Sequence, residues 1–188
     1  MSELFSIQLQ NRQQQGRDGV WLDLPTTTEQ VQAALRQIGI SSDNPQGLFI
    51  SGYFAEEEKR FAIPYNMVLA SNVDELNFLA SRLETLSTGE RAELNAALQA
   101  PQSELFSIGR ITDFPENVDY YVHLPDVRGP AQLGDYYLNR SGMVDMPEEW
   151  KGGIDTAQFG RYVAQQEQGA FTQYGYLVKS GDAWQKVH

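Results

Sequence analysis

A run of helical periodicity divides this chain into two regions of mixed pattern, and it constrains the fold more than any other feature. Between residues 71 and 100, apolar residues recur at three- and four-residue spacing. Ser71 with Asp74 forms a capping pair, Ser87 opens a second one, and Pro101 ends the run. A helical pair of about 30 residues is too small to form a stable hydrophobic core by itself. It must therefore dock on a neighbour or connect two other units.

The region before this run has the pattern of strands with one helix. Strands are predicted at residues 4–9, 19–25 and 48–54, and a helix at about 27–38, opened by a capping pair of Thr26 and Glu29. The charged run at residues 56–60 is predicted to be a solvated turn.

Strand 19–25 contains the sequence Gly-Val-Trp-Leu-Asp-Leu-Pro. We expect Trp21, Leu22 and Leu24 in the core of this region, with Asp23 on the opposite face.

The region after residue 102 returns to mixed character. Its first residues, 103–108, repeat residues 2–7 letter for letter, but the sequences that follow differ at once, which favours chance reuse over duplication. The patterns predict strands at 103–108, 120–124 and 171–178, and helices at 131–140, near 147–150 and at 155–169. Together the three regions predict an α+β fold of three small domains in line, elongated and acidic, with mixed β/α ends and a central helical unit. The predicted domains span residues 1–70, 71–102 and 103–188.

Composition excludes several classes of function. The formal net charge of −11 has the wrong sign for direct nucleic-acid binding or for an anionic membrane surface. The absence of cysteine removes disulfides and thiolate-ligated metals. No window approaches the roughly 18 apolar residues that a spanning helix needs, so we expect a soluble cytoplasmic protein without a membrane partner.

Catalytic chemistry has little support. His123 falls in a predicted strand, where a structural histidine is the more common case, and His188 is the last residue. The sequence carries no phosphate-binding glycine loop, zinc-protease motif or EF-hand spacing. We expect no catalytic residue, no metal site and no cofactor.

The negative charge is distributed along the chain rather than collected in a tail. The three predicted domains carry net charges of −3, −3 and −5, and the carboxylates are densest between residues 113 and 149, against only Arg128 and Arg140. Two interpretations account for this distribution of carboxylates. They keep the protein soluble, or they form a rigid anionic surface that occupies a DNA-binding groove. The candidate acidic surface comprises Asp113, Glu116, Asp119, Asp126, Asp135, Asp145, Glu148 and Glu149.

An ordered set of segments resembles the ArdA antirestriction family. Residues 19–25 resemble the family's early signature of a tryptophan, an acidic residue and a proline. Residues 48–54 resemble the strand that follows this signature in the family. Residues 64–80 resemble its central helical segment. The C-terminal pattern is matched in order and approximate spacing by residues 135–138, 146–150, 154–161 and 171–176. The resemblance covers nearly the whole chain.

This resemblance implies a DNA mimic that inhibits type I restriction-modification enzymes, built from three small domains and paired as a homodimer. The family's antirestriction motif would fall on residues 132–142, where Leu133, Tyr136, Tyr137 and Leu138 would supply an apolar dimer contact. The alternative for these four residues is the core of the third domain.

Two other functions stay open at this point. One is an acidic interaction module that binds another basic DNA-binding protein, such as a nucleoid protein or a repressor. The other is a hydrolase that uses His123 with a nearby aspartate.

Overall fold

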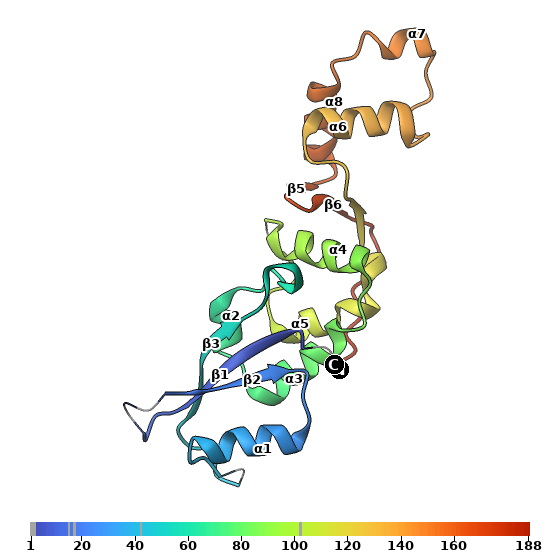
Figure 1. Cartoon of the computed structure of the whole chain (residues 1–188). Helices are drawn as coiled ribbons and strands as arrows, with labels where there is room; N and C mark the ends of the chain where they lie inside the picture. The colour runs from blue at the N-terminus through green and yellow to red at the C-terminus, as the bar shows by residue number, and fades with distance from the viewer. Residues whose placement is uncertain (1–2, 15, 17, 42, 102) are drawn as a thin grey trace. The chain divides into compact units, whose positions relative to one another are not determined.

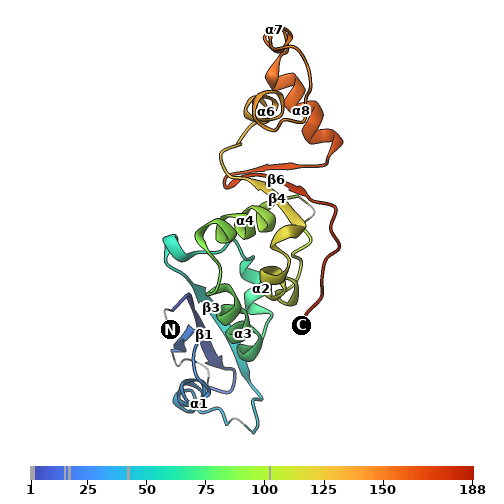
Figure 2. The ribbon, with the colours of Figure 1, turned by 90° about the vertical axis from the view of Figure 1, so that its right-hand side faces the viewer.

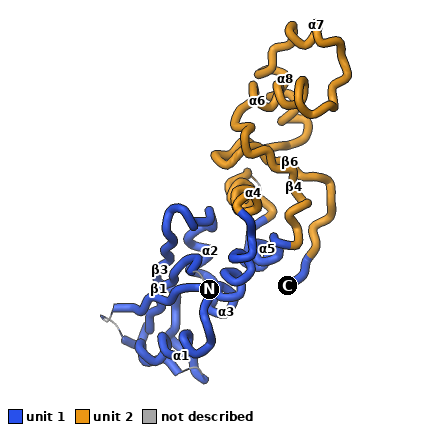
Figure 3. The backbone as a smooth tube through the Cα atoms, turned by 45° about the vertical axis from the view of Figure 1, so that its right-hand side comes forward, with its two compact units in different colours: residues 1–87, 105–115, 186–188 blue, residues 88–104, 116–185 orange. Residues whose placement is uncertain are grey.

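The computed structural model describes residues 3–14, 16, 18–41, 43–101 and 103–188. The chain forms two compact units, each assembled from segments that are distant in sequence (Figure 3). Unit 1 contains residues 1–87, 105–115 and 186–188, and unit 2 contains residues 88–104 and 116–185. The fold is mixed α+β with small antiparallel sheets, as the sequence predicts. The division into three domains in line stays a prediction.

The sheet of unit 1 has β1 (Phe5–Asn11) in its centre, between β2 (Val20–Leu24) and β3 (Leu48–Phe54), and both pairings are antiparallel (Figure 1). Alternate residues of β1 are buried, in keeping with the period of a strand with one face in the core. The predicted strands of this region are confirmed.

Three of the four α-helices in the described part of unit 1 begin at a polar cap, and the fourth, α2 (Tyr65–Leu69), follows Pro64 instead. The other three are α1 (Thr28–Gln37), α3 (Val73–Leu83) and α5 (Ile108–Thr112), and a 3-10 turn η1 lies at Glu57–Lys59. Thr27 caps α1 and Asn72 caps α3, each accepting a hydrogen bond from a backbone N–H of the first turn. The predicted caps Thr26 and Ser71 are each one residue too early.

Two long-range contacts join distant segments of unit 1. The Asn77 side chain on α3 accepts a hydrogen bond from the Thr26 backbone N–H at 2.7 Å and donates one to the Thr26 carbonyl at 3.0 Å. The backbone N–H of His188 donates to Asp113 Oδ1 at 3.0 Å, and the His188 ring lies edge-on to Phe78. The last residues therefore complete the packing of the first unit.

Unit 2 has a second small sheet in the order β4-β6-β5. Its strands are β4 (Tyr121–Leu124), β5 (Ala170–Thr172) and β6 (Gly175–Lys179), and its helices are α4 (Thr88–Gln99), α6 (Pro130–Asp135), α7 (Glu148–Lys151) and α8 (Thr156–Gln166). The 3-10 turns η2 (Phe114–Glu116) and η3 (Val118–Tyr120) precede β4, and the π-helical turn η4 (Tyr136–Arg140) continues α6.

Helices α6 and α8 pack backbone against backbone in unit 2 (Figure 2). A Cβ atom on Gly134 would collide with the Thr156 carbonyl, and one on Gly160 with the Pro130 carbonyl. Glycine at both positions allows the close approach. Leu133 of α6 and Tyr176 of β6 belong to the hydrophobic core of this unit.

Three further predictions of local structure from the sequence are wrong. Trp21 is 50% exposed, because strand alternation places it with Asp23 on the outer face while Leu22 and Leu24 are buried. Residues 103–108 do not form a strand, since Ser107 caps α5 by accepting a hydrogen bond from the Arg110 backbone N–H. Residues 171–178 form a hairpin rather than one strand, with Gly175 at φ +122° where the chain turns.

No helix in the described part of the chain is long and apolar enough to cross a membrane.

Candidate functional site

The predicted acidic surface lies mostly on folded elements of unit 2. Glu116 ends η2, Asp119 lies in η3 and Asp135 ends α6, whereas Glu148 and Glu149 form the first turn of α7. These five carboxylates are exposed, and so are Asp126 and Asp145 in the connecting segments. Helical turns hold most of the seven, so their charges are carried by an ordered backbone rather than by a tail.

Asp113 does not belong to this surface. Its exposed fraction is 1%, and it lies in unit 1, where its carboxylate accepts the backbone N–H of His188. A carboxylate buried to this extent cannot contact a partner's cations.

Two cations neutralise part of the acidic surface. Lys151 Nζ lies 2.6 Å from Glu148 Oε1, and Arg140 Nε lies 3.6 Å from Asp135 Oδ2. Asp135 also accepts a hydrogen bond from the Asn139 side chain at 2.8 Å. Each pair has at least one solvent-exposed partner, so it contributes at most about 1 kcal/mol to stability. They do lower the local negative potential, so the basic residues are not fully segregated from the acidic ones.

The segment predicted as a dimer contact is largely internal to unit 2. Leu133 is fully buried and Leu138 nearly so, whereas Tyr136 and Tyr137 are half-buried against the same core. This placement matches the alternative that the sequence left open for these residues. The segment includes the π-helical turn, in which the Ser141 N–H donates to the Tyr136 carbonyl five residues earlier at 2.8 Å.

Glu167 joins two tyrosines in unit 2. Tyr137 Oη donates to Glu167 Oε2 at 2.8 Å, and Tyr176 Oη donates to the other carboxylate oxygen. Burial, and then the hydrogen bond to this carboxylate, raises the pKa of both tyrosines. Both hydroxyls therefore stay protonated and act as donors, which fixes the end of α8 against the π-helical turn. No spacing or motif in the sequence indicates this contact.

Among the described residues of unit 2, three large apolar side chains are more than half exposed, and none of them was predicted as a contact residue. They are Met143 (75% exposed), Trp150 (66%) on α7 and Tyr162 (59%) on α8. Exposed aromatic and methionine side chains are enriched where proteins bind other proteins. The signal for Trp150 was present in the sequence, beside the acidic pair at 148–149.

Glu93 on α4 is a half-buried carboxylate in unit 2. Burial, followed by repulsion from Glu90 and Asp119, raises its pKa to about 8. Its Oε1 atom is buried and accepts no hydrogen bond from any residue that the structure describes. Glu93 therefore carries a proton over much of the neutral pH range.

His123 is held as a structural residue. Its Nε2 lies 2.8 Å from the Tyr174 carbonyl, to which it donates a hydrogen bond across the sheet of unit 2. Within the described residues, no three histidine, aspartate or glutamate side chains gather closely enough to hold a metal ion.

A family model of the antirestriction protein ArdA matches residues 15–178, nearly the whole chain. The chain belongs to the ArdA family. No curated protein sequence matches it. The ArdA match spans the described carboxylates from Glu116 to Glu149, so the exposed acidic surface lies within the region that defines this antirestriction family.

Proposed function

We propose that this ArdA protein is a stoichiometric inhibitor that mimics DNA and occupies the DNA-binding groove of a type I restriction-modification enzyme. The observation that carries the proposal is the set of exposed carboxylates held on turns and helices of unit 2 between residues 116 and 149. B-DNA carries about one negative charge per 1.7 Å of helix axis. A protein groove that binds duplex DNA is lined with cations, to which an ordered anionic surface is complementary.

This mechanism requires no catalytic residue. A basic groove recognises phosphates by position and charge, so each carboxylate contributes a modest and similar increment. Inhibition depends on charge and therefore weakens as salt is raised.

The test is a restriction assay with a purified type I enzyme, titrated with ArdA in the presence and absence of competing duplex. We expect full inhibition near molar equivalence and relief by excess duplex. Inhibition at far lower ratios of ArdA to enzyme would indicate turnover and contradict the proposal.

Charge variants make the test sharper. Glu149→Gln alone should weaken inhibition only slightly. A combined amide variant should weaken it far more and flatten its dependence on salt, with changes at Glu116, Asp119, Asp126, Asp145, Glu148 and Glu149. The Glu56–Glu58 run of unit 1 supplies three carboxylates. Its triple amide variant is compared with a triple amide variant of Asp145, Glu148 and Glu149, and this comparison separates the effect of the surface from that of total charge. If a single substitution of a carboxylate by an amide abolishes inhibition while the fold persists, inhibition depends on one discrete site and the proposal is wrong.

We also propose that the protein acts as a homodimer, with a contact that uses the exposed Trp150 and Tyr162 rather than the buried Leu133. In an isologous dimer both subunits contribute the same surface patch, so one substitution places two like charges in contact. Tyr162→Asp should dissociate the dimer in sedimentation, whereas the same charge at Gln173, which is exposed in the turn between β5 and β6, should not. A dimer that survives both changes lies elsewhere on the surface.

A second candidate is an acidic module that binds another basic protein, such as a nucleoid protein or a repressor. The ion pairs of Glu148 with Lys151 and of Asp135 with Arg140 favour it, because these cations interrupt a phosphate-like array. Affinity capture from cell extract separates the two functions. Recovery of restriction-modification subunits supports DNA mimicry of that enzyme, and recovery of other DNA-binding proteins alone supports the module.

A further inference from the structure

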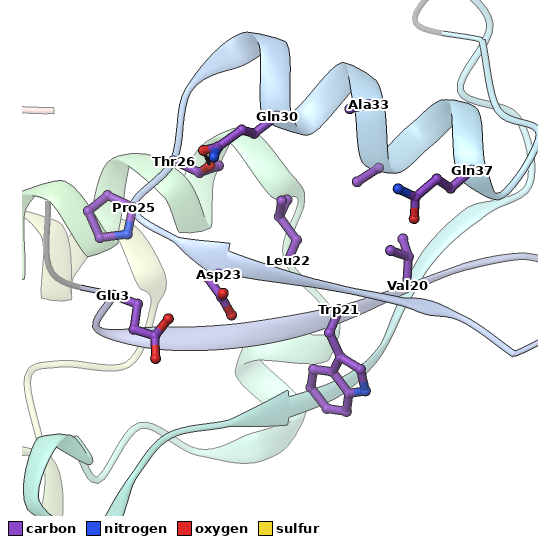
Figure 4. Close-up of a pocket in the computed structure, with 11 residues that line it drawn as sticks. Glu3, Val20, Trp21, Leu22, Asp23, Pro25, Thr26, Gln30, Ala33 and Gln37 are labelled. Carbon is purple, nitrogen blue, oxygen red and sulfur yellow. Dashed lines mark hydrogen bonds between the residues drawn. The ribbon is translucent and has the colours of Figure 1, made fainter.

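A groove of about 490 Å³ runs beside β2 in unit 1, with α1 as its other wall (Figure 4). The strand contributes the consecutive residues 20–23. The helix contributes Gln30, Ala33 and Gln37, whose three- and four-residue spacing places them on one face of α1. The groove therefore follows a strand on one side and a helix on the other.

Strand β2 lies at an edge of its sheet. Among the described residues it pairs with β1 alone. Every second backbone N–H and C=O group of an antiparallel edge strand points away from its neighbour, and these groups can pair with a further strand. Ala33 and Ala34 have short side chains, which leave room between the helix and this edge.

The two faces of β2 differ in chemistry. Leu22 points toward α1, whereas Trp21 and Asp23 point to the other face of the sheet (Figure 4). A strand added beside β2 would meet small apolar side chains on the helix side. On the opposite side it would meet the indole of Trp21 and carboxylates.

The charge of the groove is negative. Glu3 and Asp23 both line it, and none of its described lining residues is a lysine or an arginine. Asp23 also accepts a hydrogen bond from Ser6 Oγ at 2.6 Å, which fixes its side chain on the outer face. The exposed face of Trp21 adds a site for a cation, since a guanidinium or ammonium group is attracted to the face of an indole ring.

We propose that this groove binds an extended segment of another protein, in which apolar side chains alternate with lysine or arginine, as a fourth strand of the sheet. The backbone of the segment pairs with the edge of β2, its apolar side chains face Ala33 and Leu22, and its basic side chains face Trp21, Asp23 and Glu3. Five residues, the length of β2, are enough to span the groove. The proposal does not depend on inhibition of a restriction enzyme, because the carboxylates proposed for that role lie in unit 2.

The probe is a labelled hexapeptide in which valine alternates with arginine, and its binding to the full chain is measured by fluorescence anisotropy. A second hexapeptide has the same sequence and charge but carries a methyl group on every backbone nitrogen, so neither of its edges can donate to a strand. Those methyl groups prevent strand pairing. An acidic protein attracts both peptides equally by charge, so a difference between them reports the backbone pairing.

The groove is tested by Ala33→Arg, which places bulk and a like charge in the path of the probe. Gln32→Arg is the matched control, because it adds the same charge to an exposed position of α1 that does not line the groove. We expect Ala33→Arg to weaken binding by about tenfold or more and Gln32→Arg by less than about twofold. The double variant Glu3→Gln, Asp23→Asn should weaken binding of the probe and reduce its dependence on salt.

Hydrogen exchange tests the proposal on the unmodified chain, so the result does not depend on whether a variant folds. The probe should slow exchange of outward-facing amides in residues 20–24 of the unmodified chain, and the methylated peptide should not. Equal binding of the two peptides, or an equal effect of the two arginine variants, would overturn the proposal. Dissociation of a dimer by Ala33→Arg would also overturn it, by showing that the occupant is a second copy of this chain.

Discussion

Glu93 should make the stability of unit 2 depend on pH in a direction unusual for a carboxylate. Burial, with repulsion from Glu90 and Asp119, raises its pKa in the folded protein from 4.5 to about 8. The folded state therefore binds more protons than the unfolded state between these two values. The stabilisation is fully present below about pH 4.5 and is lost as the pH rises through about 8.

The size of the effect follows from the shift. Each unit of pKa difference corresponds to about 1.4 kcal/mol, so the full shift sets an upper limit of about 5 kcal/mol. Glu93 is only half-buried, and solvent screening reduces the expected contribution to about 1–2 kcal/mol. Glu93→Gln keeps the shape of the side chain and removes its titration.

Urea unfolding at pH 5 and pH 9 measures this contribution. Between these pH values, the unmodified protein should lose about 1–2 kcal/mol more stability than Glu93→Gln. Glu149→Gln, at an exposed position of the same unit, controls for the loss of one negative charge and should keep the unmodified dependence on pH. If Glu93→Gln and the unmodified protein lose the same free energy within about 0.5 kcal/mol, the carboxyl is ionised throughout and the reasoning is wrong.

Three further substitutions have expected outcomes that urea unfolding can check. Gly160→Ala should cost about 3 kcal/mol because its Cβ has no room between α6 and α8, whereas Gly152→Ala, with open space around it, should change little. Trp21→Ala should cost about 1 kcal/mol, and a cost of 3 kcal/mol or more would show that the half-exposed indole is buried in solution. Glu167→Gln should cost about 1–2 kcal/mol and, in an ultraviolet titration, lower the pH at which Tyr137 ionises.

The sequence predicted those elements whose signals are local. Alternation in residues 5–11 and the helical spacing of 73–83 identified β1 and α3, since their periods differ and their buried positions repeat. The caps were misplaced by one residue because Thr26 and Thr27, like Ser71 and Asn72, are adjacent residues that can both cap a helix.

The repeated sequence at residues 2–7 and 103–108 shows where local signals end. Phe5 lies in β1 and is 3% exposed, whereas Phe106, its counterpart, is 68% exposed outside any strand. Ser6 remains in the strand and donates to Asp23, but Ser107 caps the helix that follows it. The partner strand β2 and the residues after 108 decide the conformation, and neither is encoded in the six shared residues.

The candidate site was predictable to a similar extent. Exposure of most carboxylates follows from the cost of burying a charge, so their placement on the surface needed only their identity. Asp113 is the exception, because its partner is the backbone of a residue 75 positions later. The burial of Leu133 likewise depends on Ala164 and Tyr176, which no spacing in the sequence associates with it.

The interleaving of the two units has a consequence for synthesis on the ribosome. Unit 1 begins with the first residues of the chain but also includes residues 186–188, where the His188 backbone bonds to Asp113 and its ring contacts Phe78. Translation proceeds at about 5–20 residues per second. Roughly 5–20 s therefore pass between synthesis of residue 87 and synthesis of residue 188, which supplies the last contacts of unit 1. During that interval the Phe78 ring and the Asp113 carboxylate lack these partners. The nascent chain is thus exposed to chaperones and proteases for longer than an uninterrupted N-terminal unit would be.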